Sequence, residues 1–99
     1  MAYFVEFRES VRDYLRGIDG LSDDDRAAII DEVIEELSRD ADRFLVQFPL
    51  AHESLCFRYD YARVTARAMF QFDFIVDASA LEMGVVRVVY VESTSQPLL

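Results

Sequence analysis

Four arginines in the second half of the chain are the residues whose type and placement best suit chemistry: Arg58, Arg63, Arg67 and Arg87. A guanidinium stays charged near neutral pH and binds phosphates or carboxylates through a rigid fork of N–H donors. The first three fall on the polar side of the sheet predicted below, and Arg87 interrupts a valine-rich strand, where a charge needs a partner or a solvent-facing groove. We therefore predict an anion site for a phosphate backbone or for a partner's carboxylates. The alternative is that these arginines pair internally across strands with Asp60, Asp73, Asp77 and Glu92.

Other chemically capable residues are few. His52 is the single histidine, so a histidine-rich metal site cannot form, and no cofactor motif is present. His52 next to Glu53 could act as an acid–base pair, but with no nucleophile nearby a surface or capping role is expected. The aspartates at 23–25 lack the glycine and the spacing of a calcium loop and suit a helix start. Cys56, beside apolar residues of a predicted strand, is expected to be a small buried thiol. We predict no metal and no cofactor.

The charge of the chain is strongly negative and unevenly distributed. The net charge is −9, and residues 1–53 carry 14 acidic residues against 6 arginines. Residues 54–99 carry 5 acidic residues against 4 arginines. Such a field disfavours binding to RNA, the ribosome or anionic lipid, and it favours solubility or a basic partner. The chain has no lysine, which excludes lysine-based nucleophilic or Schiff-base chemistry.

A change of hydrophobic period near Leu55 predicts the elements that position these side chains. Before it, apolar residues recur three and four apart, as on helices, and after it they alternate, as on strands. We predict one α+β domain over residues 1–99 with the order strand, helix, helix, three strands. The helical hairpin should pack on one face of a mainly antiparallel sheet. A single cysteine and the lack of a run of about 18 apolar residues favour a cytoplasmic protein without a membrane span.

In the first half, a strand is predicted over residues 2–8, and Ser10 is the N-cap candidate of the first helix, which Gly17 and Gly20 end. The second helix should begin at Ser22, with three carboxylates at the positive end of its dipole. Pro49 would end any remaining helix. The stripe expected to face the sheet is Ala27, Ile30, Val33, Ile34, Leu37, Ala41 and Leu45.

In the second half, alternation predicts a short strand followed by a longer alternating tract over residues 63–77. That tract is long for a strand, so a bend, a bulge or a helical turn over residues 62–69 should divide it. A hairpin loop is expected over residues 77–84, and a central strand that is apolar on both faces over residues 85–91. The predicted buried side chains are Leu55, Phe57, Tyr59, Tyr61, Val64, Ala66, Ala68, Phe70, Phe72, Phe74 and Val76.

This order of elements, together with four segments, resembles the RelE/ParE toxin superfamily of toxin–antitoxin systems. Residues 3–10 (YFVEFRES) resemble the family's opening strand and its passage into the first helix. Residues 55–59 (LCFRY) resemble the strand that carries an arginine after the helical hairpin. Residues 67–77 (RAMFQFDFIVD) resemble the arginine-led strand that ends in an acidic turn, and residues 85–91 (VVRVVYV) resemble its hairpin partner.

The resemblance implies a toxin that is neutralised by a cognate antitoxin. One branch of the family cleaves mRNA on the ribosome without metal, and another acts on gyrase with the same scaffold. It implies Arg58 and Arg67 as catalytic residues, followed by Arg87 and Tyr90. These last two have opposite parity, so a bulge would be needed to bring them to one face. The absence of lysine, the net charge of −9 and a C-terminal segment without basic or aromatic residues imply altered or lost activity.

Two functions are therefore carried forward. The first is a RelE/ParE-like toxin component, which would be a metal-independent endoribonuclease if active. The second is a non-catalytic protein-interaction module on the same fold. The expected partner is an antitoxin or another protein; RNA or the ribosome is disfavoured by charge, no membrane is expected, and a homodimer stays open.

Overall fold

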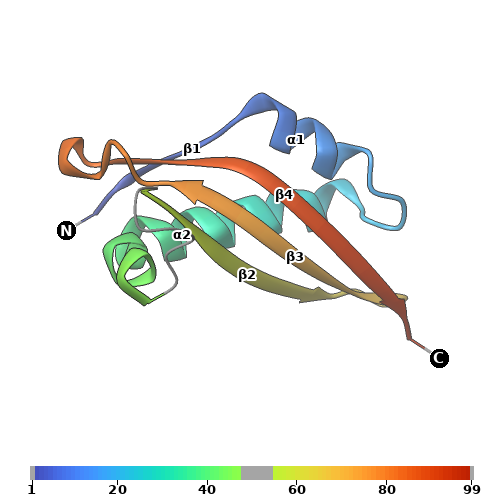
Figure 1. Ribbon diagram of the computed structural model, residues 1–99. Helices are drawn as coiled ribbons and strands as arrows, with labels where there is room; N and C mark the ends of the chain where they lie inside the picture. The colour runs from blue at the N-terminus through green and yellow to red at the C-terminus, as the bar shows by residue number, and fades with distance from the viewer. Residues whose placement is uncertain (1, 48–54, 99) are drawn as a thin grey trace.

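The computed structural model describes residues 2–47 and 55–98 and confirms the predicted α+β order. Strand β1 (Phe4–Phe7) leads into helices α1 (Glu9–Arg16) and α2 (Asp23–Gln47). Strands β2 (Cys56–Val64) and β3 (Ala68–Asp77) follow, and a short 3₁₀ helix (Leu81–Met83) connects to β4 (Val85–Pro97). The helices cover one face of the sheet (Figure 1). Among the described residues, no helix is long and apolar enough to cross a membrane.

The four strands form one sheet in the order β1-β4-β3-β2. Strands β2, β3 and β4 pair antiparallel, whereas β1 pairs parallel with β4. Strand β1 covers only the first part of β4, from Val85 to Val88. Strand β2 lies at the opposite edge, where β3 is its neighbour. The mainly antiparallel sheet is as predicted, and the parallel pair makes it mixed.

The core lies between the sheet and α2. On β3, Phe70, Phe72 and Phe74 stack with ring centroids 6.3 and 5.9 Å apart, close to the repeat of alternate residues on a strand. From α2, Val33, Leu37 and Ala41 are fully buried against the sheet. Alternation predicted most of the buried sheet residues correctly, because a sheet covered on one side hides every second side chain.

The buried face of α2 is rotated relative to the predicted stripe. Ile29 and Phe44 are buried although neither was predicted, whereas Ala27 is exposed. Phe44 packs against Phe57 and Tyr59, with ring centroids 6.1 and 5.2 Å apart. An aromatic ring removes far more apolar surface from water than an alanine methyl group, so the ring decides which face turns inward. The remaining predicted stripe residues, Ile30, Ile34 and Leu45, are partly buried at its border.

The two predicted helix caps have different outcomes. Ser22 caps α2: its Oγ accepts a hydrogen bond from the Asp25 N–H at 3.0 Å and donates to the Asp25 carboxylate at 2.9 Å. Ser10 does not cap α1, which begins at Glu9, two residues earlier than predicted, with Arg8 at the cap position. The Arg8 N–H donates to the Val88 carbonyl at 2.9 Å, so pairing with β4 determines where the strand ends and the helix starts.

The tract over residues 63–77 is divided as predicted, but the bend at its dividing point is a full reversal of the chain and not a bulge or a helical turn. Arg63 and Val64 belong to β2, and the chain reverses at residues 65–67. The Thr65 N–H donates to the Ala68 carbonyl at 2.9 Å, and the Ala68 N–H donates to Thr65 Oγ1 at 3.1 Å. The reversal changes parity, because odd residues of β2 and even residues of β3 face the helices. Val64 is therefore exposed, against the prediction.

Strand β4 contains a β-bulge between Arg87 and Tyr90. Such a bulge is needed for these two residues, which have opposite parity, to lie on the same face of the sheet. Val88 lies opposite Val76 and Tyr90 lies opposite Ile75, so Val89 is the extra residue. Beyond the bulge β4 continues to Pro97, past the predicted end at residue 91. The loop before β4 lies where it was predicted, and Gly84 there has a φ of +78°.

The two serines allow a matched test of the cap. Replacing Ser22 by alanine should lower the free energy of unfolding by about 1 kcal/mol, because the Asp25 N–H loses its partner. Replacing Ser10 by alanine should change the free energy of unfolding by no more than a few tenths of a kcal/mol, because this serine lies inside α1. Urea denaturation followed by circular dichroism measures both. Equal losses for the two variants would contradict the assignment of the cap.

Candidate functional site

The face of the sheet opposite the helices carries charged side chains in rows across the strands. The first row runs from Asp77 to Arg87 and on to Glu6, as the strand register aligns them. In the second row Arg58 lies opposite Ile75, which lies opposite Tyr90. The third row contains only acidic side chains, from β2, β3 and β4: Asp60, Asp73 and Glu92.

Two predicted site residues, Arg58 and Arg87, lie on this open face and are ion-paired. Arg58 Nε is 3.3 Å from Asp60 Oδ1 on the same strand. Arg87 Nε donates to Glu6 Oε2 at 2.9 Å, across the parallel pair of strands. Both arginines thus pair internally, as in the alternative, but Arg58 does so within its own strand and Arg87 does so with a partner that was not predicted. Glu6 was not among the predicted partners, because the sequence pattern carries no sign of the parallel pairing of β1 with β4.

Arg63 and Arg67 lie elsewhere, so the structure does not bring the four arginines together. Arg63 was predicted on the polar face, but it points toward α2, with Nε 3.1 Å from Asp25 and Nη1 3.6 Å from Glu32. The Ser22 hydroxyl, followed by Arg63, donates hydrogen bonds that hold the pKa of Asp25 below its usual value. Arg67 lies exposed in the turn between β2 and β3.

The acidic row contains a carboxyl pair. At one end of the β2–β3 hairpin the Thr65 N–H donates to the Ala68 carbonyl, and at the other end the Ala78 N–H donates to the Leu55 carbonyl. These bonds show that the odd-numbered residues of β2 form the hydrogen-bonded pairs with β3. Asp60 and Asp73 therefore form a non-hydrogen-bonded backbone pair, in which opposite side chains approach most closely. The side-chain hydrogen bond that protonated Asp60 donates to the Asp73 carboxylate, together with desolvation, raises the pKa of Asp60 despite the nearby Arg58.

Tyr90 and Glu92 complete the polar surface of β4. The Tyr90 hydroxyl donates to Glu92 Oε1 at 3.0 Å, and this hydrogen bond raises the pKa of Tyr90. The tyrosine is half-exposed and lies in the same row as Arg58, with Ile75 of β3 between them. Tyr90 is thus held as a hydrogen-bond donor on the open face.

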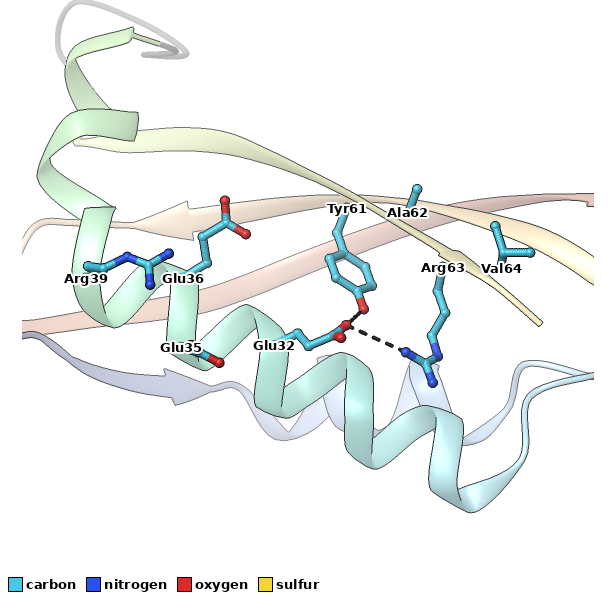
Figure 2. A pocket seen from close by; sticks show the side chains of 8 residues that line it. All are labelled: Glu32, Glu35, Glu36, Arg39, Tyr61, Ala62, Arg63 and Val64. Atoms are coloured by element: carbon cyan, nitrogen blue, oxygen red, sulfur yellow. Dashed lines mark hydrogen bonds and ion pairs between the residues drawn. The ribbon is translucent and has the colours of Figure 1, made fainter.

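A groove of about 490 Å³ lies between α2 and β2. From α2 it is lined by Glu32, Glu35, Glu36 and Arg39, and from β2 by residues 61–64. Figure 2 shows Tyr61 and Arg63 pointing toward Glu32, while Ala62 and Val64 point away from the helix. The sequence pattern gives no sign of this groove, because the acidic residues of α2 have the spacing of an ordinary solvated helix face.

Tyrosines from β2 hold two of these glutamates. The Tyr59 hydroxyl donates to Glu36 Oε2 at 2.5 Å, and the Tyr61 hydroxyl donates to Glu32. Burial, and then the hydrogen bond to Glu36, raises the pKa of Tyr59 well above its usual value. Helix α2 and strand β2 therefore run antiparallel, with Glu36 beside Tyr59 and Glu32 beside Tyr61.

The chemistry available to these surfaces is the binding of charged groups. Among residues 2–47 and 55–98, no group of three or more histidine, cysteine, aspartate or glutamate side chains is arranged to hold a metal ion. Cys56 is partly exposed, so the prediction of a buried thiol is only partly met. The candidate pair His52 and Glu53, like Pro49, lies outside the described residues.

Comparison of the chain with protein-family models, with curated proteins and with solved structures gives no match.

The carboxyl pair predicts a pH-dependent effect on stability. Since the pKa of Asp60 is raised in the folded state, its contribution is favourable below about pH 3.8 and is lost as the pH rises through the raised value. The Asp60 side chain is 63% exposed, so solvent screens the repulsion. Asp60→Asn should therefore stabilise the protein at pH 7 by about a few tenths of a kcal/mol, and the gain should vanish toward pH 3.

Urea denaturation at several pH values measures this gain. Glu82→Gln removes the same charge from an exposed position outside the sheet and serves as the control. A destabilising Asp60→Asn substitution at pH 7, or a gain of equal size in both variants, would contradict the carboxyl pair.

Proposed function

We propose that this protein is a non-catalytic protein-binding module whose binding surface is the groove between α2 and β2. The observation that carries this proposal is the charge of the groove lining, in which three glutamates of α2 outnumber two arginines. Helix α2 contains nine carboxylates and three arginines, a net charge of −6. Such a surface attracts basic groups of a partner and repels nucleic acid.

The ion pairs of three arginines also favour a binding function over a catalytic one. Arg58 and Arg87 are each ion-paired within the sheet, and Arg63 is held by Asp25 and Glu32. Recruiting them to a phosphate would require these pairs to break. A protein partner can instead use the groove as it stands, which keeps the loss of side-chain freedom on binding small.

Neutralising the groove tests this function. The triple variant Glu32→Gln, Glu35→Gln, Glu36→Gln keeps the amide oxygens as acceptors for the tyrosine hydroxyls, so the fold should persist. A partner captured from the native host should be retained by the wild-type protein and lost from this variant. The matched control, Asp31→Asn with Asp42→Asn and Glu82→Gln, removes three exposed charges outside the groove and should retain the partner.

Affinity capture followed by mass spectrometry, with circular dichroism as the check on folding, makes the comparison. Equal retention by both triple variants would contradict the groove as the binding surface. Loss of the partner from the control alone would do the same.

A toxin component of the RelE/ParE kind is the second candidate. Two observations favour it: the order of elements matches the resemblance, and the bulge at Val89 brings Arg87 and Tyr90 to the open face. Arg58 lies in the same row as Tyr90, so three of the four implied catalytic residues share this surface. Arg67, the fourth, lies in the turn beyond the strands.

This candidate predicts growth arrest when the chain is expressed without an antitoxin. Arg58→Ala combined with Arg87→Ala should relieve the arrest, because it removes both cations from the open face. Arg16→Ala, on the exposed side of α1, should not relieve it. Growth curves after induction, with the soluble protein quantified, provide the measurement. Normal growth of cells that accumulate the folded wild-type chain would contradict the toxin function.

A further inference from the structure

We infer that the outer edge of β2 takes up a basic, extended segment of the partner protein as a fifth strand. This inference rests on the proposed function and specifies what the groove binds. Four observations carry it: the outward backbone groups of β2 over residues 58–64, the protected state of the other edge, the spacing of the glutamates on α2, and the charge of that helix.

Strand β2 presents a row of backbone groups that its neighbour does not use. Among the described residues β2 has one neighbour in the sheet, β3, and its odd residues make the hydrogen bonds to that strand. The N–H and C=O groups of the even residues therefore point outward: Arg58, Asp60, Ala62 and Val64. Such a row is the template on which an added strand pairs.

The other edge of the sheet, by contrast, is protected. Past Val88, where β1 ends, the Ser93 N–H of β4 donates to the Tyr14 hydroxyl at 3.2 Å. Arg8 donates to the Val89 carbonyl at 3.4 Å, and Pro97 has no N–H to offer. A side chain or a proline thus guards the outer part of β4, as is common at edges that must not pair. Over residues 58–64 of β2, the described part of the chain contains no proline and no such bond from a side chain.

The spacing of the glutamates along α2 matches the spacing of alternate side chains on a strand added at this edge. Glu32 and Glu36 are four residues apart on the helix, about 6 Å along its axis. Alternate residues of a strand are about 6.6 Å apart, and Tyr59 and Tyr61 of β2 already match these two glutamates. Basic side chains at positions i and i+2 of an added strand would therefore reach the same carboxylates.

Charge also separates a basic partner from a second copy of this chain. Two β2 edges paired antiparallel about Tyr59 would place Arg58 opposite Asp60 of the other copy, which is favourable. The same pairing would bring two α2 helices together, each with a net charge of −6. Like charges at such an interface cost binding energy, so the edge suits a basic segment better than a second copy.

A synthetic peptide tests the inference directly. The probe is a labelled nine-residue peptide that alternates lysine and threonine, and fluorescence anisotropy at low salt measures its binding. We expect saturable binding that weakens with added salt and drops on the order of tenfold in the triple glutamine variant of the groove. Amide exchange by NMR should slow at Arg58, Asp60, Ala62 and Val64 when the peptide is bound.

Two control peptides separate strand addition from simple charge attraction. The first carries N-methyl groups on alternate backbone amides, which keeps its charge but removes the donors that would face β2. The second replaces every lysine by glutamate. Equal binding of either control, no protection of the β2 amides, or a dimeric protein held together by its β2 edges would overturn the inference. If the lysine peptide fails to bind while the groove variant still loses the captured partner, the fifth strand is wrong and the proposed function stands.

Discussion

The packing of α2 against one face of the sheet is the constraint on which the rest of this structure depends. Val33, Leu37 and Ala41 are fully buried in the same core cluster as the aromatic row of β3. Because successive residues of a strand point to opposite faces, covering one face fixes which side chains meet solvent on the other. The charged rows of the open face and the tyrosine–glutamate contacts at the groove both follow from this single contact between layers.

Hydrophobic periodicity was sufficient to predict the layers but not the register. Phe57, Tyr59 and the phenylalanines of β3 were predicted on the buried face, because alternation alone specifies it. The turn at residues 65–67 contains no glycine, proline or asparagine, and Thr65 closes it with its side-chain oxygen. When residues 63–77 are treated as one strand, the alternating pattern places Arg63 on the open face of the sheet, whereas it lies on the face toward α2. A parity error of one residue moves a charge to the other side of the sheet.

The candidate site was predictable only where a single strand defines it. Arg58 and Arg87 lie on the open face as their positions suggested, and the bulge at Val89 meets the condition set for Tyr90. Contacts between elements that are distant in sequence were not predictable. The pairing of Arg87 with Glu6 needs the parallel β1–β4 contact, and the groove needs the antiparallel placement of α2 along β2. The composition shows that the chain is acidic, but only the fold shows that the glutamates of α2 line a groove beside β2.

The glutamates that line the groove serve the fold and remain able to bind. Glu32 and Glu36 each accept a hydrogen bond from a tyrosine of β2, yet a carboxylate has about four acceptor sites. The tyrosines hold these carboxylates in place, which lowers the entropy that a partner must remove when it binds. An acidic helix held in this way, beside a strand edge with outward N–H and C=O groups, presents charge and backbone acceptors in one fixed arrangement. This joint arrangement, more than any single residue, distinguishes the groove from an ordinary solvated helix face.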